Sequence, residues 1–258
     1  MAISFVAADS SYGTASINLD ANVSAQSMSV SMRLKMSQAD VAASKWILTA
    51  GTFPTNHQIF MNFNEFYDNI MFGIKNGTSQ TGGYHLTNKD GDDVWTNYLF
   101  TFNYSVIDQT NWNAFVEGVD EGLSVVATNT GTQFIGSTTL YVNAKNGTPD
   151  EENDMLLQDL AFYDGLMTIA DAKELAAGAS PLQVRPNKLF YYWPLVRDGK
   201  ELIQGADMTL NSTTVVSIGL PTFQPATPII GVPVAAAATG AGFPFPSSAG
   251  LPLPILAR

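Results

Sequence analysis

The chain has 258 residues, of which 45% are hydrophobic and only 14% are charged, and its formal net charge is −11. This acidic balance argues against binding to nucleic acid through a basic surface. The absence of cysteine excludes a disulfide framework, a thiol nucleophile and a cysteine-based zinc site. The N-terminus lacks the features of a secretory signal, and no proline-free apolar segment reaches the roughly eighteen residues that a membrane span needs. We therefore expect neither a nucleic-acid partner nor a membrane.

Alternation of apolar and polar residues dominates the chain. In 27-SMSVSMRL-34 every second residue is apolar and the others are Ser or Arg, which is typical of a strand with one buried face. The same pattern between turn signals predicts strands at 3–7, 14–19, 27–34, 46–50, 57–63, 69–75, 98–106, 112–117, 122–127, 138–144, 156–163, 188–196 and 207–216. Glycines in 76–83 are interpreted as turn material. About a dozen strands predict an all-β sandwich or barrel.

One stretch, 156-LLQDLAFYDGLMTIADAKELAAG-178, predicts a strand that leads into a single short helix. Thr168 can cap the helix N-terminus, and Asp171, three residues on, can complete a capping box. Gly178 supplies the C-terminal stop. Since a helix over 169–177 is too short to persist alone, we expect it to pack on the sandwich.

The last residues differ in composition from the rest. From Pro221 onward the only charged residue is Arg258, and eight of the thirteen prolines fall there. Proline spacing excludes a long helix and a central strand. We expect 217–258 to form an extended Pro/Ala/Gly-rich arm that lies against a neighbouring subunit, with a flexible tail as the alternative. The expected partner-binding residues of the arm are its large apolar ones: Phe223, Ile229, Ile230, Val232, Phe243, Phe245, Leu251, Leu253, Ile255 and Leu256.

Several segments resemble those of laminin-G-like, concanavalin A-like domains. The strand that ends in Tyr163-Asp164, followed by a helix with Glu174 near its end, resembles the closing strand and helix of that family. The segments 95-WTNYLFTFNYSV-106 and 112-WNAFVEGVDEGLSVV-126 resemble its central strand and next hairpin, although the usual Asp-Gly of the turn is Glu-Gly here.

The segment 178–216 contains an Arg-Pro pair and a Tyr-Trp-Pro-Leu strand, and it is similar to laminin-G-like proteins of tailed-phage virions. The resemblance covers roughly residues 1–216. It implies an all-β, concanavalin A-like (laminin-G-like) antiparallel β-sandwich jelly roll with one short α-helix, followed by the arm at 217–258.

Few residues in the sequence suggest a catalytic or a metal-binding site. Glycosidases need two carboxylates that face one cleft, but alternation places Glu117 and Glu121 on one side and Asp120 on the other, and Gly118 indicates a turn. We expect a solvated hairpin there and no enzyme. The acidic runs 88-NKDGDD-93 and 150-DEEND-154 do not match an EF-hand loop, and solvated loops are the simpler interpretation.

No cofactor site is evident. His57 and His85 are the only histidines and lie in no catalytic motif. The four tryptophans, Trp46, Trp95, Trp112 and Trp193, fall in or beside predicted strands, where core anchoring is the usual role. A lectin site cannot be located from these positions.

Two functions remain. The resemblance implies a non-enzymatic structural protein of a phage virion, most simply a capsid decoration or cement protein. It would be made in the host bacterial cytoplasm, would sit on the capsid surface, and would take the major capsid protein and its own copies, as a homotrimer, for partners. The alternative is a carbohydrate-binding tail-fibre or baseplate adhesin domain that binds host-surface glycans.

Overall fold

The computed structural model describes most of the chain up to residue 216. The described residues are 1–19, 27–36, 45–52, 56–64, 69–76, 80–86, 93–103, 112–127, 137–145 and 154–216. The arm expected at 217–258, with all of its apolar residues, lies outside the described residues and stays a prediction.

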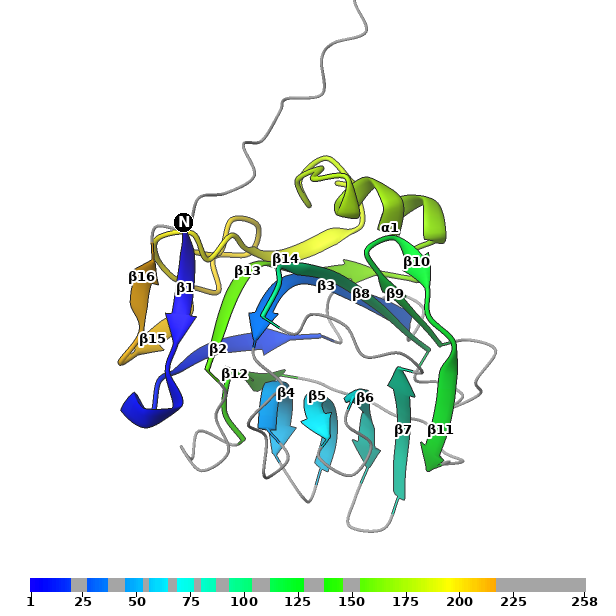
Figure 1. The fold of residues 1–258 in the computed structure, drawn as a ribbon, viewed down its shortest axis with the longest axis horizontal. Coiled ribbons are helices and arrows are strands. Elements are labelled where there is room, and N and C mark those ends of the chain that lie inside the picture. Colours follow the sequence, from blue (N-terminus) through cyan, green and yellow to red (C-terminus); the bar gives the residue numbers. More distant parts are fainter. Residues whose placement is uncertain are drawn as a thin grey trace, which may run out of the picture. The chain divides into compact units, whose positions relative to one another are not determined.

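The described chain forms two antiparallel sheets (Figure 1). Sheet A consists of β1 (Ala2–Phe5), β3 (Ser27–Met36), β8 (Thr96–Asn103), β9 (Asn113–Val116), β10 (Val119–Asp120), β13 (Met155–Asp164), β14 (Leu189–Trp193) and β16 (Thr214–Val216). Sheet B consists of β2 (Tyr12–Asn18), β4 (Lys45–Thr52), β5 (Asn56–Asn64), β6 (Asn69–Asn76), β7 (Gln80–Leu86), β11 (Leu123–Ala127), β12 (Ser137–Val142) and β15 (Thr209–Asn211). A 3-10 turn, Ala7–Asp9, and one helix, α1 (Ile169–Ala176), complete the described elements.

The main core lies between the two sheets. It takes the alternate apolar residues of strands from both sheets, such as Met32 and Leu34 of β3, Phe72 of β6 and Phe162 of β13. Phe72 and Phe100 lie 4.6 Å apart between ring centroids, so aromatic rings join the sheets directly. The two sheets and this core confirm the predicted jelly-roll sandwich.

Strand β13 changes its neighbour halfway along. Its first part pairs with β1 and its second part with β14, while β3 follows its other edge throughout. At the change of neighbour the register with β3 slips by one residue between Gln158 and Ala161, and Asp159 adopts a positive φ of 55°. The Asp159 N–H donates to the Pro194 carbonyl at 3.0 Å. This bulge places Gln158 and Asp159 on the side of the sheet away from the main core.

Helix α1 covers part of the outer face of sheet A, the face turned away from the main core. It contacts β8, β9 and β10, and a second hydrophobic cluster there joins Ala172 and Leu175 of the helix to Leu99, Phe115 and Tyr163 of the sheet. The helix was predicted as 169–177 and spans Ile169–Ala176, with the predicted capping box of Thr168 and Asp171 present.

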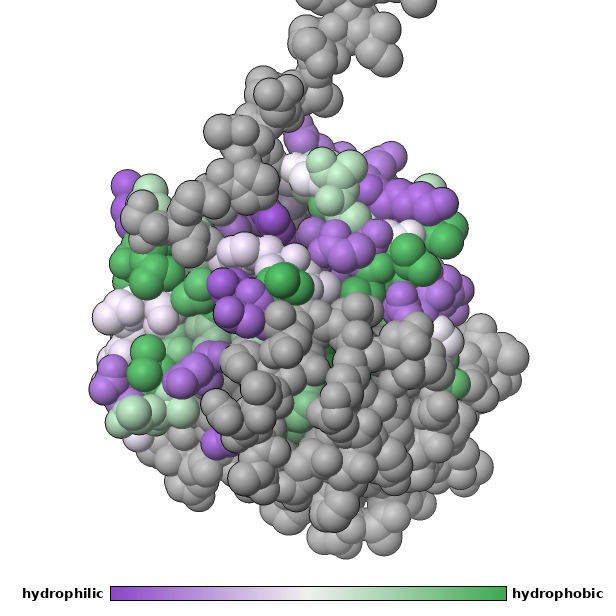
Figure 2. All heavy atoms as spheres, viewed as in Figure 1, coloured by the Kyte–Doolittle hydropathy of each residue, from purple (hydrophilic) through white to green (hydrophobic). Residues whose placement is uncertain are grey.

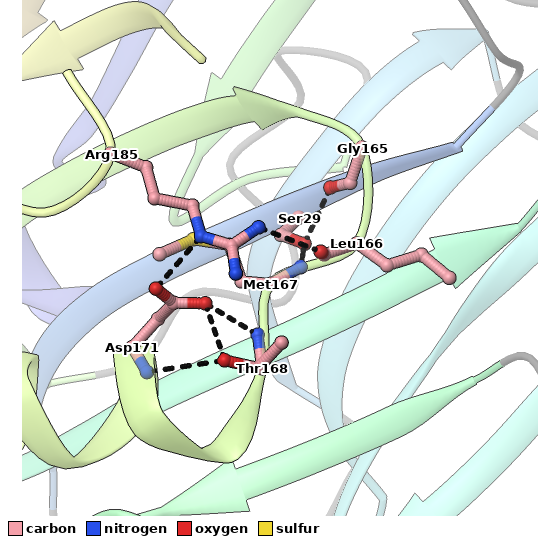
Figure 3. Close-up of polar contacts among 7 residues, drawn as sticks. All are labelled: Ser29, Gly165, Leu166, Met167, Thr168, Asp171 and Arg185. Carbon is pink, nitrogen blue, oxygen red and sulfur yellow. Dashed lines mark hydrogen bonds and ion pairs between the residues drawn. The ribbon is translucent and has the colours of Figure 1, made fainter. Parts of the chain in front are cut away.

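Figure 3 shows how the start of α1 is fixed. The Asp171 carboxylate accepts hydrogen bonds from the Thr168 N–H at 2.6 Å and the Thr168 hydroxyl at 2.7 Å, and it also accepts one from Arg185 Nε at 2.8 Å. Ser29 of β3 donates to the Gly165 carbonyl and accepts from the Met167 N–H, both at 2.9 Å. The start of the helix is thereby connected to β3 through Ser29 and to the segment after the helix through Arg185.

Three local predictions were wrong. Residues 80–86 form strand β7, although 76–83 was interpreted as turn material, because Gly82 and Gly83 pair across to β6. The predicted single strand at 207–216 is two short strands, β15 and β16, which belong to different sheets. Alternation along 188–196 predicts that Phe190 and Tyr191 lie on opposite faces, but a slip in the pairing of β13 with β14 places both residues in the main core.

Candidate functional site

The outer face of sheet A also carries a group of polar residues, partly next to the cluster under α1, that we call the outer polar cluster. It comprises Ser31 and Arg33 of β3, Gln158, Asp159 and Tyr163 of β13, and Tyr192 of β14. Arg33 lies directly opposite Gln158 on one side and Asn97 of β8 on the other. The main-core residues Met32 and Leu34 alternate with Arg33, so its side chain belongs to the opposite face.

Four buried polar atoms of this cluster have no hydrogen-bond partner. They are Ser31 Oγ, Arg33 Nε, Gln158 Oε1 and the Tyr163 hydroxyl. In the described part of the chain only one other buried side-chain atom, Asn62 Oδ1 on sheet B, shares that condition. Buried polar atoms are nearly always paired, because an unpaired one loses its hydration without compensation. Their concentration on neighbouring positions of two strands singles out this part of the sheet.

Asp159 is the charged centre of the cluster. Its carboxylate accepts a hydrogen bond from the Tyr192 hydroxyl at 2.6 Å. Burial raises the pKa of Asp159, and the Tyr192 hydrogen bond and the Arg33 charge oppose that shift without cancelling it. Burial also raises the pKa of Tyr192, as do the charge and the hydrogen bond of Asp159. The phenol therefore stays protonated and acts as a donor.

Tyr163 lies among the same groups. Burial, followed by the charges of Asp159 and Asp171, raises the pKa of its phenol, while the nearby Ser31 hydroxyl lowers it. The two hydroxyls are close enough to influence each other but do not meet the geometry of a hydrogen bond. Both retain a proton that they can donate.

Trp95 marks the open end of the cluster. It precedes β8 on the same side as Asn97 and is half-buried, in contrast to the fully enclosed Trp112 and Trp193. The Arg33 guanidinium lies 5.9 Å from the centroid of the Trp95 ring, within the range of a cation–π contact. Next to them, Lys35 pairs with Asp93 at 3.3 Å. The indole of Trp95, the guanidinium of Arg33 and the amide of Asn97 thus occupy adjacent positions on a partly exposed strip of sheet A.

The face of the molecule drawn in Figure 2 is not a continuous apolar patch over the described residues. On the face drawn in Figure 2, hydrophilic and hydrophobic side chains are interspersed over the described part of the chain. This composition differs from that of a large hydrophobic docking surface.

The other predicted candidates lie elsewhere. Glu117 and Gly118 form the expected hairpin turn with positive φ angles of 48° and 73°, and the Glu117 carboxylate accepts from the Asn97 N–H at 2.5 Å. Asp154 accepts from the Ala7 N–H at 2.7 Å. In the described ranges no group of three or more metal-ligating side chains comes together. The side chains of His57 and His85, and most of both acidic runs, lie outside the described residues.

The outer polar cluster was not predicted from the sequence, although two signals for it exist. Trp95 lies an even number of positions from the polar residues Asn97 and Asn103, so alternation places it on the solvent-facing side of its strand. Leu157 and Leu160 both face the main core, and their spacing of three requires one irregularity between them. Neither signal says which polar side chains meet.

Comparison with known proteins supports the fold alone. No family model matches the chain, and no curated protein matches it. Among solved structures, a native heptameric SAP-like pentraxin from Limulus polyphemus has a TM-score of 0.51 at 14% identity and covers 81% of this chain and 93% of its own. A candidate carbohydrate-binding protein from Bacteroides ovatus has a TM-score of 0.56 at 12% identity, and the match covers 85% of this chain but only 60% of that one.

In the described residues no helix is long and apolar enough to cross a membrane. Neither neighbour is a phage protein, so the phage origin stays a prediction. With its sheet order, its core and these two likenesses, the described chain has a concanavalin A-like, laminin-G-like jelly-roll fold.

Proposed function

We propose that this protein is a non-enzymatic glycan-binding module and that Arg33 of the outer polar cluster, together with Trp95 and Asn97, forms its binding surface. The observation that carries the proposal is the contact between the partly exposed residues Arg33 and Trp95 at 5.9 Å, with the partly exposed Asn97 directly opposite Arg33. Sugars offer ring faces that pack on aromatic side chains and hydroxyls that bond to amides, hydroxyls and guanidinium groups. The strip provides the aromatic ring of Trp95, the amide of Asn97 and the guanidinium of Arg33.

The rigidity of the strip also favours binding. Arg33, Gln158 and Asn97 are held in register by paired strands, and sites on strands are positioned more accurately than sites on loops. The fold likeness to the Bacteroides protein, described as a candidate for carbohydrate binding, adds support from a chain with the same architecture. The glycans of a host surface, expected as partners of the adhesin alternative, are the natural ligands in this proposal.

A glycan array followed by titration calorimetry tests the proposal. Wild-type protein is expected to bind a subset of glycans, and Trp95→Ala is expected to weaken that binding by about tenfold or more, because the ring supplies the packing surface. Tyr141→Ala is the matched control, since Tyr141 is a half-buried aromatic residue on sheet B. Glycan binding that is lost in Tyr141→Ala and kept in Trp95→Ala would place the site on sheet B and would refute the proposed site on sheet A.

A second function, capsid decoration, rests on the composition of residues 217–258. Apolar side chains without charge, spaced by proline, gain burial only against a partner, and proline lowers the entropy lost on ordering. The proposed partners are the major capsid protein and other copies of this chain, in a trimer. Deleting 221–258 is expected to reduce self-association and binding to expanded capsids. Unchanged assembly and capsid binding of the truncated chain would refute the arm.

A further inference from the structure

We propose that the arm of one copy of this chain adds a strand to the open edge of sheet A in a second copy, and that residues 230–234 form that strand beside β16. The inference rests on the proposed self-association through the arm and specifies the surface that receives it. It is independent of glycan binding by Arg33 and Trp95.

Strand β16 ends sheet A on one side. It pairs with β1, and in the described part of the chain no strand lies on its other side. The Ile3 N–H of β1 donates to the Leu195 carbonyl, next to the Pro194 carbonyl that accepts from β13, so the backbone groups of Ile3 point away from β16. Because these directions alternate along an antiparallel pair, Val215, which lies opposite Ile3, turns its own N–H and C=O to the open side.

The side chain of Val215 belongs to the core-facing side of the sheet but is not covered. It lies directly opposite Ile3 of the main core, yet it is 46% exposed. On β15, the edge strand of sheet B that precedes β16, Leu210 packs against the main core and is only half-buried. An edge with unpaired backbone groups is a template for a further strand. Here such a strand would also bury the exposed valine.

The arm suits this edge because of the spacing of its β-branched residues and prolines. In 230-IGVPV-234, Ile230, Val232 and Val234 alternate with Gly231 and Pro233. In an extended strand the first three side chains share one face, and their N–H groups share one edge. With that edge turned to β16, Pro233, which has no N–H, lies at the new outer edge, where proline is tolerated and blocks further strands.

The register follows from symmetry of the two short segments. Val232 is the middle residue of 230–234 and Val215 is the middle residue of β16, so they are placed opposite each other in either strand direction. Both side chains then lie on the core-facing side. Prolines at 221, 225 and 228 favour an extended course for the preceding part of the arm. An extended course carries residues 230–234 away from their own β16 and towards that of a neighbouring copy.

Disulfide cross-linking tests the contact directly, because the natural chain has no cysteine. Val215→Cys and Val232→Cys proteins, one of them with a size tag, are mixed and oxidised. A covalent heterodimer is expected, since directly opposite residues bring their Cα atoms within the range of a disulfide. Covalent oligomers are expected from the double variant. Val119→Cys in place of Val215→Cys is the control, because Val119 is 56% exposed on β10, at the opposite end of sheet A.

Charge substitutions test the contribution of the contact to self-association, measured by analytical ultracentrifugation. Val215→Asp and Val232→Asp are each expected to weaken it about tenfold or more, because a carboxylate would be buried among apolar side chains. Val119→Asp and Pro233→Asp are the matched controls and are expected to associate as wild type does. The first lies on the far edge of the sheet, and the second lies on the other face of the added strand. Thermal unfolding of each variant checks that the fold is retained.

The possible failures are distinguishable. A monomeric wild type, or self-association unchanged by deletion of 221–258, overturns the proposed role of the arm and the inference together. If the deletion abolishes self-association but Val215→Asp does not, and no heterodimer forms beyond the Val119→Cys control, only the strand beside β16 is overturned. An internal disulfide in single chains of the double variant, without covalent oligomers, also overturns the inference, because the arm then returns to its own sheet.

Discussion

One carboxylate, that of Asp171, caps the start of α1 and holds Arg185 from the segment after the helix, and Asp171→Asn tests its contribution to stability. Asp171 accepts three hydrogen bonds, two from Thr168 and one from Arg185. Asparagine keeps the shape but presents its NH2 group to at least one of these donors. Losing the cap costs about 0.5–2 kcal/mol, and losing the half-exposed Arg185 pair adds about 0.5 kcal/mol. We expect a total of about 2 kcal/mol, or about 4–8 °C in Tm for a sandwich of this size.

The stabilisation by the Asp171 carboxylate should depend on pH in a defined direction. Burial raises the pKa of Asp171, but the hydrogen bonds from Thr168 and Arg185 outweigh it, so the pKa lies below its usual value of 3.8. The stabilisation is therefore present above that usual value and is lost as the pH falls through the lowered pKa. The stability difference between wild type and Asp171→Asn should be full at pH 7 and should shrink in strong acid.

Thermal and urea unfolding measure this difference, and Glu174→Gln is the control, because it removes the same charge from an exposed position of the same helix. The control is expected to stay within about 0.5 kcal/mol of wild type. An Asp171→Asn variant as stable as wild type at pH 7, or equally destabilised at all pH values, would refute the role assigned to the carboxylate.

Three further predictions concern stability, each measured by thermal unfolding. Glu201→Gln should cost about 2–3 kcal/mol, because the buried carboxylate accepts from several backbone N–H groups, including that of Tyr192 at 2.7 Å; an unchanged Tm would contradict this. Gly199→Ala should lower the free energy of unfolding by about 3 kcal/mol or more, since its Cβ would lie 2.1 Å from the Met208 carbonyl oxygen. Gly205→Ala, at a positive φ with open space around it, should lower it by about 1 kcal/mol. Equal losses in the two variants would contradict this steric explanation. Asp159→Asn should raise Tm at pH 7 but not at low pH. The pKa of Asp159 is raised in the folded state, so its ionisation destabilises the fold as the pH rises, and Asn removes that ionisation. A lower Tm of the variant at pH 7 would contradict this prediction.

Local patterns in the sequence predicted the fold well where a residue's own strand or turn decides its environment. Period-two alternation located most strands, and Thr168 and Asp171 identified the helix start because a capping box is a purely local arrangement. The same reasoning identified the hairpin turn at Glu117-Gly118. These features need no knowledge of what lies across the sheet.

The outer polar cluster could not be predicted in this way, because it depends on non-local register. Gln158 and Asp159 reach the same face only through the bulge in β13, and Arg33 meets them only because β3 and β13, more than a hundred residues apart in the chain, are neighbours in sheet A. Gln158 looks like an ordinary polar residue within an apolar strand until its opposite residue is known. The division of 207–216 between two sheets was missed for the same reason.

The strip of sheet A around Arg33, Asn97 and Trp95 is the proposed glycan-binding site. A crystal structure of the full chain in complex with its tightest-binding oligosaccharide tests this directly. A sugar ring is expected to lie against Trp95, and a sugar oxygen is expected to accept a hydrogen bond from Arg33 within about 3 Å. An oligosaccharide bound on sheet B or at the loop tips, with Arg33 and Trp95 out of contact, would contradict it.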